Sequence, residues 1–182
     1  MKEEILVEQL KAGNKDAFDA LYEKYKNLAI HTAYLITGNL PDSEDIVQDT
    51  FVKVYLHSRE LKNNSGFKAW MMQILVRTAY RMEKKKSREF PDEETIIRME
   101  DRTDLSSLDK VMQLEEARRL QYVVKTLPVR QRTVVILFYY DQFSISEIAK
   151  MLGIMEGTVK SRLYTARLRM KKALESEKED LI

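Results

Sequence analysis

The sequence has no cysteine and few residues that break helices. Its 182 residues include three prolines, five glycines and two histidines. Without cysteine the chain can form neither a disulfide framework nor a thiolate metal site, which is consistent with a reducing cytoplasm. Few prolines and glycines, beside 33 % charged residues, favour helices joined by short turns.

Long apolar stretches are also missing. A transmembrane helix needs about 18 or more apolar residues in a row, and the longest apolar stretch here covers only residues 133–140. The N-terminus is polar and amphipathic, without the apolar core of a signal peptide. With 44 % hydrophobic residues the chain can still form packed cores. We therefore expect a cytoplasmic protein that does not insert into the membrane.

The motifs of common enzyme classes are absent as well. His31 and His57 lie at unrelated positions, and neither belongs to a metal-ligand spacing such as HExxH. No GxxxxGK[ST] or GxGxxG loop is present to bind nucleotide phosphates. We expect no catalytic residues, no metal site and no cofactor.

The segment Ser144–Leu174 is the most informative part of the chain. A short amphipathic stretch with Ser144 or Ser146 as its N-cap precedes Gly153, which suits a turn with positive φ. A second, basic amphipathic stretch then follows. Its apolar positions are Val159, Leu163, Ala166, Met170 and Leu174. This order is typical of a helix-turn-helix, whose second helix enters a DNA major groove.

The opposite face of this second helix carries short polar side chains first and cations later. That order suits base edges near the helix start and phosphates further on. A solvated basic face is the alternative interpretation, but the preceding short helix and Gly153 favour DNA binding. On this basis the DNA contacts are expected at Thr158, Ser161, Tyr164, Thr165 and Lys171.

Charge is unevenly distributed, although the net charge is only +2. Residues 67–88 hold seven basic residues and one acidic, and residues 111–182 hold 13 basic and nine acidic. Between them, residues 89–110 hold three basic and eight acidic residues. Two basic blocks indicate two nucleic-acid contacts in one molecule, although solvated faces also show such blocks.

The acidic block predicts a boundary between two domains. Residues 89–108 combine a proline, an acidic run and a Ser-Ser pair, without sustained helical periodicity. The predicted helices lie near residues 3–12, 16–37, 42–57, 67–87, 109–126, 129–140, 144–152 and 156–176. The predicted fold is all-α, with two small helical domains (1–88 and 109–182) joined by a flexible acidic linker.

The predicted third helix has one apolar and one polar face. Asp42 is placed as its N-cap, and Val47, Phe51, Val54 and Tyr55 form a core-like face. Early carboxylates such as Asp42 and Glu44 are explained by capping and by the helix dipole. The polar surface of this helix is formed by Asp45, Gln48 and Asp49. Gln48 and Asp49 lie past the first turn, so capping explains them less well.

A basic ridge and a polar loop make up a third candidate site. Arg77, Arg81, Lys84 and Lys85 recur at near-helical spacing, as expected of a ridge that neutralises phosphates. The preceding loop supplies amides and a hydroxyl that suit an unstacked base, although a plain polar loop is the alternative. Its candidate residues are Asn63, Asn64 and Ser65.

Taken in order, these motifs resemble an extracytoplasmic-function (ECF) sigma factor of the sigma-70 family. The similarity is carried by DSEDIVQDTFVKVY, FKAWMMQI, LPVRQRTVVILFYYDQFSISEIAKMLGI and GTVKSRLYTAR. It implies binding to core RNA polymerase (the β′ clamp and the β flap) and to promoter DNA, with control by an anti-sigma factor.

The resemblance also implies roles for individual residues. It assigns Asp45, Gln48 and Asp49 to the polymerase clamp. The −10 element falls to Asn63, Asn64, Ser65, Trp70, Arg77 and Lys84, with Lys85 on the same ridge. The −35 element falls to Lys160, Ser161, Arg162 and Tyr164.

Some positions depart from the family pattern. Arg77 and Arg81 stand where the family commonly has Asn and Asp, Met155 where a proline is usual, and Thr165 where a basic residue is frequent. These departures affect any inferred promoter sequence and not the fold. The competing hypothesis is a dimeric helix-turn-helix repressor, and the polar third helix and the basic ridge favour the sigma factor. A helical scaffold fits the two basic blocks poorly.

Overall fold

The computed structural model describes residues 2–89 and 119–179, and its elements there are all helical. The N-terminal part contains α1 (Glu3–Lys11), α2 (Lys15–Thr37), α3 (Leu40–His57) and α4 (Phe67–Glu89), with 3₁₀ turns at Ser58–Glu60 and Asn64–Gly66. The C-terminal part contains a helical segment 119–126, α6 (Val129–Val135), a π-helical turn (Ile136–Tyr140), α7 (Ile145–Leu152) and α8 (Glu156–Glu179). The predicted linker, and most of the helix expected at 109–126, lie outside the described residues, so the domain boundaries stay a prediction.

Local signals set most of the helix ends. Gly38 and Gly153 have positive φ values of 71° and 64° and end α2 and α7, as a residue without Cβ permits. The prediction that Asp42 caps α3 is wrong. The cap is Asn39, whose Oδ1 accepts a 2.9 Å hydrogen bond from the backbone N–H of Asp42. The helix begins earlier than expected because Pro41 is tolerated in the first turn, where the N–H groups have no helical partner.

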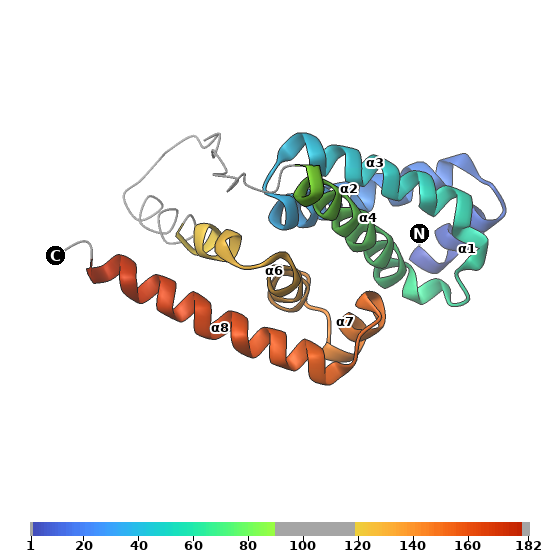
Figure 1. Ribbon diagram of the computed structural model, residues 1–182. Coiled ribbons are helices and arrows are strands. Elements are labelled where there is room, and N and C mark those ends of the chain that lie inside the picture. Colours follow the sequence, from blue (N-terminus) through green and yellow to red (C-terminus); the bar gives the residue numbers. More distant parts are fainter. Residues whose placement is uncertain (1, 90–118, 180–182) are drawn as a thin grey trace, which may run out of the picture.

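The core of the N-terminal domain lies between α2, α3 and α4, which pack side by side (Figure 1). Phe51 and Val54 of α3, and Phe67 and Met71 of α4, are almost fully buried, as their helical spacing predicts. Tyr55 was expected in this core, and that prediction is wrong. Its side chain is 47 % exposed and meets only the edge of the core, with its ring centroid 5.4 Å from that of Phe18.

The C-terminal domain is built on α8. Val159, Leu163 and Ala166 are buried against α6 and α7, and Met170 packs on the same core, in agreement with the predicted apolar face. Residues 129–140 were expected to form one regular helix. Instead the π-helical turn follows α6, and the Asp141 N–H donates to the Ile136 carbonyl at 3.0 Å.

The two domains are in contact, and α7 lies against α4 (Figure 1). Gln73 of α4 donates to the Lys150 and Met151 carbonyls at the end of α7, at 3.3 and 3.4 Å. The buried Arg132 guanidinium donates to the Ile36 carbonyl at 2.6 Å. We call the packing of α6, the π-helical turn and α7 against α2 and α4 the interdomain contact.

Candidate functional site

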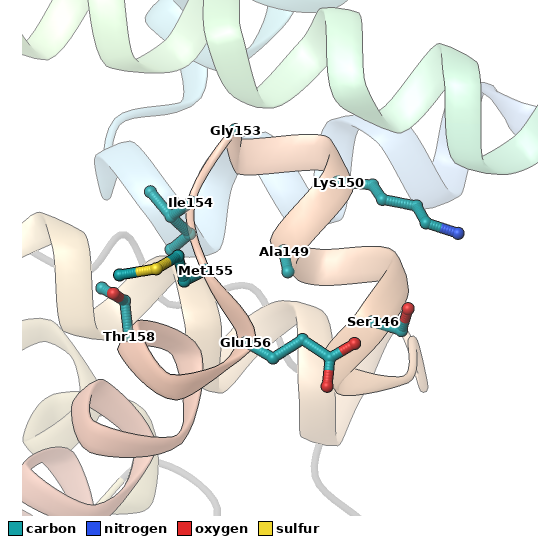
Figure 2. Close-up of a pocket in the computed structure, with 8 residues that line it drawn as sticks. All are labelled: Ser146, Ala149, Lys150, Gly153, Ile154, Met155, Glu156 and Thr158. Atoms are coloured by element: carbon teal, nitrogen blue, oxygen red, sulfur yellow. The ribbon is translucent and has the colours of Figure 1, made fainter.

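The helix-turn-helix is formed by α7, the turn at Gly153 and α8. Ser144 and Glu147 make a reciprocal capping box at the start of α7, and these hydrogen bonds lower the pKa of Glu147. Of the two serines considered as N-caps, Ser144 is the one observed. Figure 2 shows the hollow between the two helices, a cavity of about 530 Å³. It is lined by Ser146, Ala149, Lys150, Gly153, Ile154, Met155, Glu156 and Thr158.

The predicted −35 residues lie together on α8. Lys160, Ser161, Tyr164 and Lys171 are exposed, whereas Thr158, Arg162 and Thr165 are partly buried. The two short hydroxyls are turned toward their own helix: Ser161 donates to the Thr158 carbonyl at 3.0 Å and Thr165 to the Ser161 carbonyl at 2.9 Å. Lys171 lies 3.7 Å from Glu175, an exposed pair of little energetic weight. The outward face of the helix start is therefore dominated by Lys160 and Tyr164.

The polar side chains of the loop before α4 do not all face the same way. Asn63 and Ser65 are exposed, and the Asn63 Oδ1 accepts from the Ser65 N–H at 3.1 Å and from its hydroxyl at 2.8 Å. Asn64 is bonded to α1 instead, through Glu8 and Lys11. The sequence placed all three in one group, and nothing in the local pattern separates Asn64 from its neighbours.

The basic ridge continues from this loop along α4. Arg77, Arg81, Lys84 and Lys85 are exposed. Trp70 lies between the ridge and the core: it is partly buried, and its ring centroid is 6.2 Å from that of Phe67. Cations and an aromatic edge on one helix suit an opened DNA strand, because such strands bind through phosphate contacts and base stacking.

The predicted polymerase-binding residues form a separate surface on α3. Asp45, Gln48 and Asp49 are all exposed, and Asp49 pairs with Lys53 at 3.2 Å. Two apolar residues follow these polar residues on α3 and are also exposed: Val52 at 52 % and Leu56 at 68 %. Leu56 was not assigned to this surface from the sequence, although it falls off the spacing of the core face. Exposed apolar side chains grouped on one helix, with polar residues at their edge, are consistent with a protein-binding surface.

A second cavity, of about 700 Å³, was not expected from the sequence. It lies between α2, the helical segment 119–126, the π-helical turn and α8, and its lining is mainly apolar. His31, Leu35, Leu120, Val135, Met170 and Leu174 are among its lining residues. We call it the apolar groove. Burial lowers the pKa of His31, whose ring packs edge-on against Tyr140 at 4.6 Å.

Neither a membrane-spanning helix nor a metal-binding cluster is found among the described residues. Within residues 2–89 and 119–179, no helix is long and apolar enough to cross a bilayer. In the same ranges, no group of three or more His, Asp or Glu side chains is placed to hold a metal ion.

Comparison with known proteins matches both halves of the chain to one family. The sigma-70 region 2 model matches residues 21–89 and the sigma-70 region 4 model matches residues 117–170. The ECF RNA polymerase sigma factor SigW of Bacillus subtilis is 32 % identical over 177 residues, covering 92 % of this chain and 94 % of SigW. SigM of Mycobacterium tuberculosis, also an ECF RNA polymerase sigma factor, is 29 % identical over 164 residues, covering 90 % of this chain and 80 % of SigM.

Solved structures agree with these matches. CnrH, in complex with the cytosolic domain of CnrY, has the same fold, with a TM-score of 0.70 at 23 % identity over 96 % of this chain and 97 % of CnrH. The sigma factor RpoE of Bartonella quintana, in complex with the anti-sigma factor NepR, has a TM-score of 0.69 at 25 % identity, over 87 % of this chain and 96 % of that one. With both sigma-70 regions matched in order and a relative similar over nearly its whole length, this chain belongs to the ECF sigma factors of the sigma-70 family.

Proposed function

We propose that this protein binds core RNA polymerase and directs transcription initiation at promoters that carry specific −35 and −10 elements. The observation that carries the proposal is the presence, on one chain, of a helix-turn-helix and a separate basic helix beside an exposed polar loop. Duplex DNA is recognised by a helix in the major groove, whereas an opened strand needs phosphate contacts and stacking. One chain with both surfaces suits a protein that holds a duplex element and opens another.

The division of work follows the three surfaces. The start of α8, around Lys160, Arg162 and Tyr164, contacts the −35 duplex. The loop with Asn63 and Ser65 and the ridge on α4 contact the −10 element. The polar face of α3 contacts the polymerase clamp, and the C-terminal domain contacts the β flap. The protein acts in the cytoplasm, as a binding factor without enzymatic activity of its own.

An anti-sigma factor regulates the protein in this proposal. The support is the RpoE–NepR complex, because that sigma factor shares the fold at 25 % identity. The apolar groove is the candidate surface, since concave apolar surface on a monomer marks an interaction site. An amphipathic helix with an apolar stripe would fill it.

Run-off transcription tests the function. Purified core polymerase and a promoter library are combined with and without the full-length protein. Promoter-specific transcripts that appear only with the protein are expected. A dimeric repressor would instead bind duplex operator unaided, with half-sites about one helical turn apart, so strong binding of free duplex without transcription contradicts the proposal.

The clamp assignment is tested by changing Gln48→Ala together with Asp49→Ala. Both side chains are exposed, so the free energy of unfolding should change by less than about 1 kcal/mol. Binding to core polymerase, measured by fluorescence anisotropy, should weaken. Asp19→Ala is the matched control, because it removes one exposed carboxylate from α2. A double variant that binds core as tightly as wild type, or that unfolds, contradicts the assignment.

A further inference from the structure

Helix α1 is fixed to the body of the N-terminal domain along its length. Leu6, Val7 and Leu10 are buried in the core. At its start, the Glu3 carboxylate accepts a 2.6 Å hydrogen bond from the Tyr25 hydroxyl and pairs with Lys24. Burial raises the pKa of Glu3, but the hydrogen bonds from Lys24 and Tyr25 outweigh it, and the net shift lowers the pKa. The helix is therefore held in place both at its start and along its buried face. It precedes the residues that match sigma-70 region 2.

Helix α1 also contacts the loop that precedes α4, through residues along its length. The Asn64 Nδ2 donates to Glu8 Oε2 at 2.7 Å and to the Glu4 carbonyl at 3.5 Å. Lys11 Nζ donates to Asn64 Oδ1 at 2.5 Å. Arg59, from the 3₁₀ turn after α3, donates to the Lys11 carbonyl at 3.2 Å. Both ends of the Asn64 carboxamide are thus held by α1, two of the bonds being charge-assisted.

This attachment decides which loop side chains face outward. With Asn64 turned toward α1, Asn63 and Ser65 on either side of it are exposed. Asn63 Oδ1 is occupied by the Ser65 N–H and hydroxyl, so the two form one small unit. The Asn63 carboxamide nitrogen remains able to donate outward, as the hydrogen-bonding edge of an unstacked base requires.

We propose that Glu8 and Lys11 of α1 are positioning residues for −10 recognition, acting through Asn64 to hold the loop that presents Asn63 and Ser65 to an unstacked base. The inference rests on the proposed function, since it assumes that this loop contacts the −10 element. It assigns Asn64 to support and not to base contact. Loop geometry matters for discrimination because a hydrogen bond weakens steeply when its angle is poor.

The test uses the full-length protein with core polymerase on two promoter libraries, one randomised in the −10 element and one in the −35 element. Glu8→Ala removes the acceptor of the Asn64 amide, and we expect base discrimination at one −10 position to fall by about tenfold. The −35 profile should not change, because α8 is untouched. Glu8→Gln keeps an oxygen acceptor at the same place and should retain the wild-type −10 profile.

Glu4→Ala is the matched control. It removes one exposed carboxylate from the same helix, while only the backbone carbonyl of Glu4 contacts Asn64. Its −10 profile should match wild type, so a change in Glu8→Ala cannot be a general effect of lost negative charge near DNA.

The outcomes separate the possible failures. A Glu8→Ala variant with the wild-type −10 profile overturns the inference, as does one that loses −10 and −35 discrimination equally. An Asn64→Ala variant that loses −10 discrimination while Glu8→Ala keeps it shows that Asn64 contacts the base directly. Wild-type protein that yields no promoter-specific transcripts contradicts the proposed function itself.

Discussion

At the scale of single residues, hydrogen-bond partners decide which side chains are available to DNA. Ser161 and Thr165 donate their hydroxyl protons to backbone carbonyls of α8. A hydroxyl that donates within its own helix must give up that bond before it can donate to a base, and otherwise it can only accept, so we expect these hydroxyls to discriminate weakly. The Thr165 side chain is also too short for the bidentate guanine contact that arginine can make in a major groove.

Thr165→Arg should therefore change the −35 preference. The residue lies one turn after Ser161 on the same face of α8, within reach of the major groove in the proposed arrangement. We expect guanine to be favoured at one −35 position by about 1–3 kcal/mol, without loss of activity. Transcription across a −35 library measures the preference, and an unchanged profile would mean that α8 lies differently in the groove.

Lys171→Ala is the counterpart for phosphate contacts. Lys171 is exposed and lies almost two turns beyond Thr165, where the proposed arrangement places the backbone of the duplex. Its loss should weaken binding about equally on all sequences and flatten the slope of log affinity against log salt by nearly one unit. Titration of a promoter complex at several salt concentrations checks this, and a sharply altered base preference would contradict it.

At the scale of the helices, the sequence predicts those features that are set by residues nearby in the chain, such as helix positions and turns. Apolar spacing and turn glycines placed α1, α2, α4, α7 and α8 within a few residues, because periodicity and positive φ are local properties. Asn39 was missed as the cap of α3 because Asp42 offers the same chemistry three residues later. The direction of Asn64 and the exposure of Tyr55 depend on other helices, so their own neighbourhoods could not reveal them.

The capping box of α7 should matter for the stability of the helix-turn-helix. The Ser144 hydroxyl accepts from the Glu147 N–H at 3.3 Å, and Glu147 Oε2 accepts from the Ser144 N–H at 2.8 Å. Ser144→Ala removes the hydroxyl, which should cost about 1 kcal/mol in the free energy of unfolding. Urea denaturation followed by circular dichroism measures it. Ser146→Ala is the control, since Ser146 is not the N-cap, and equal losses in both variants would refute the assignment.

At the scale of the whole molecule, the interdomain contact places polar groups where water is excluded. Asp141, which follows the π-helical turn, is 3 % exposed, and Thr32 of α2 donates to its carboxylate at 3.0 Å. Burial raises the pKa of Asp141 to about 6, although the Thr32 hydroxyl and the Lys68 charge act to lower it.

The raised pKa of Asp141 makes the contact pH-dependent. In the unfolded chain the carboxyl has its ordinary pKa of 3.8, so the folded form binds more protons between about pH 4 and pH 6. The stabilisation of the folded form that results from this proton binding is fully present below about pH 4 and is lost as the pH rises through 6. His31 opposes it, because burial lowers its pKa and its protonation at low pH disfavours the folded form. Comparing wild type with a variant changed only at Asp141 separates the two effects, because His31 is present in both.

Asp141→Asn keeps an acceptor for the Thr32 hydroxyl and removes the titration. At pH 7.5 the variant should be more stable than wild type, by an amount on the order of 2 kcal/mol, because it buries no charge. At pH 5 this difference in the free energy of unfolding should decrease by about 1 kcal/mol, because the wild-type carboxyl becomes protonated. Urea denaturation of both proteins at the two pH values measures this difference, with Asp19→Asn as the control for loss of one exposed carboxylate. If the difference in the free energy of unfolding does not change with pH, Asp141 is solvated in solution. The interdomain contact around it would then not form as described.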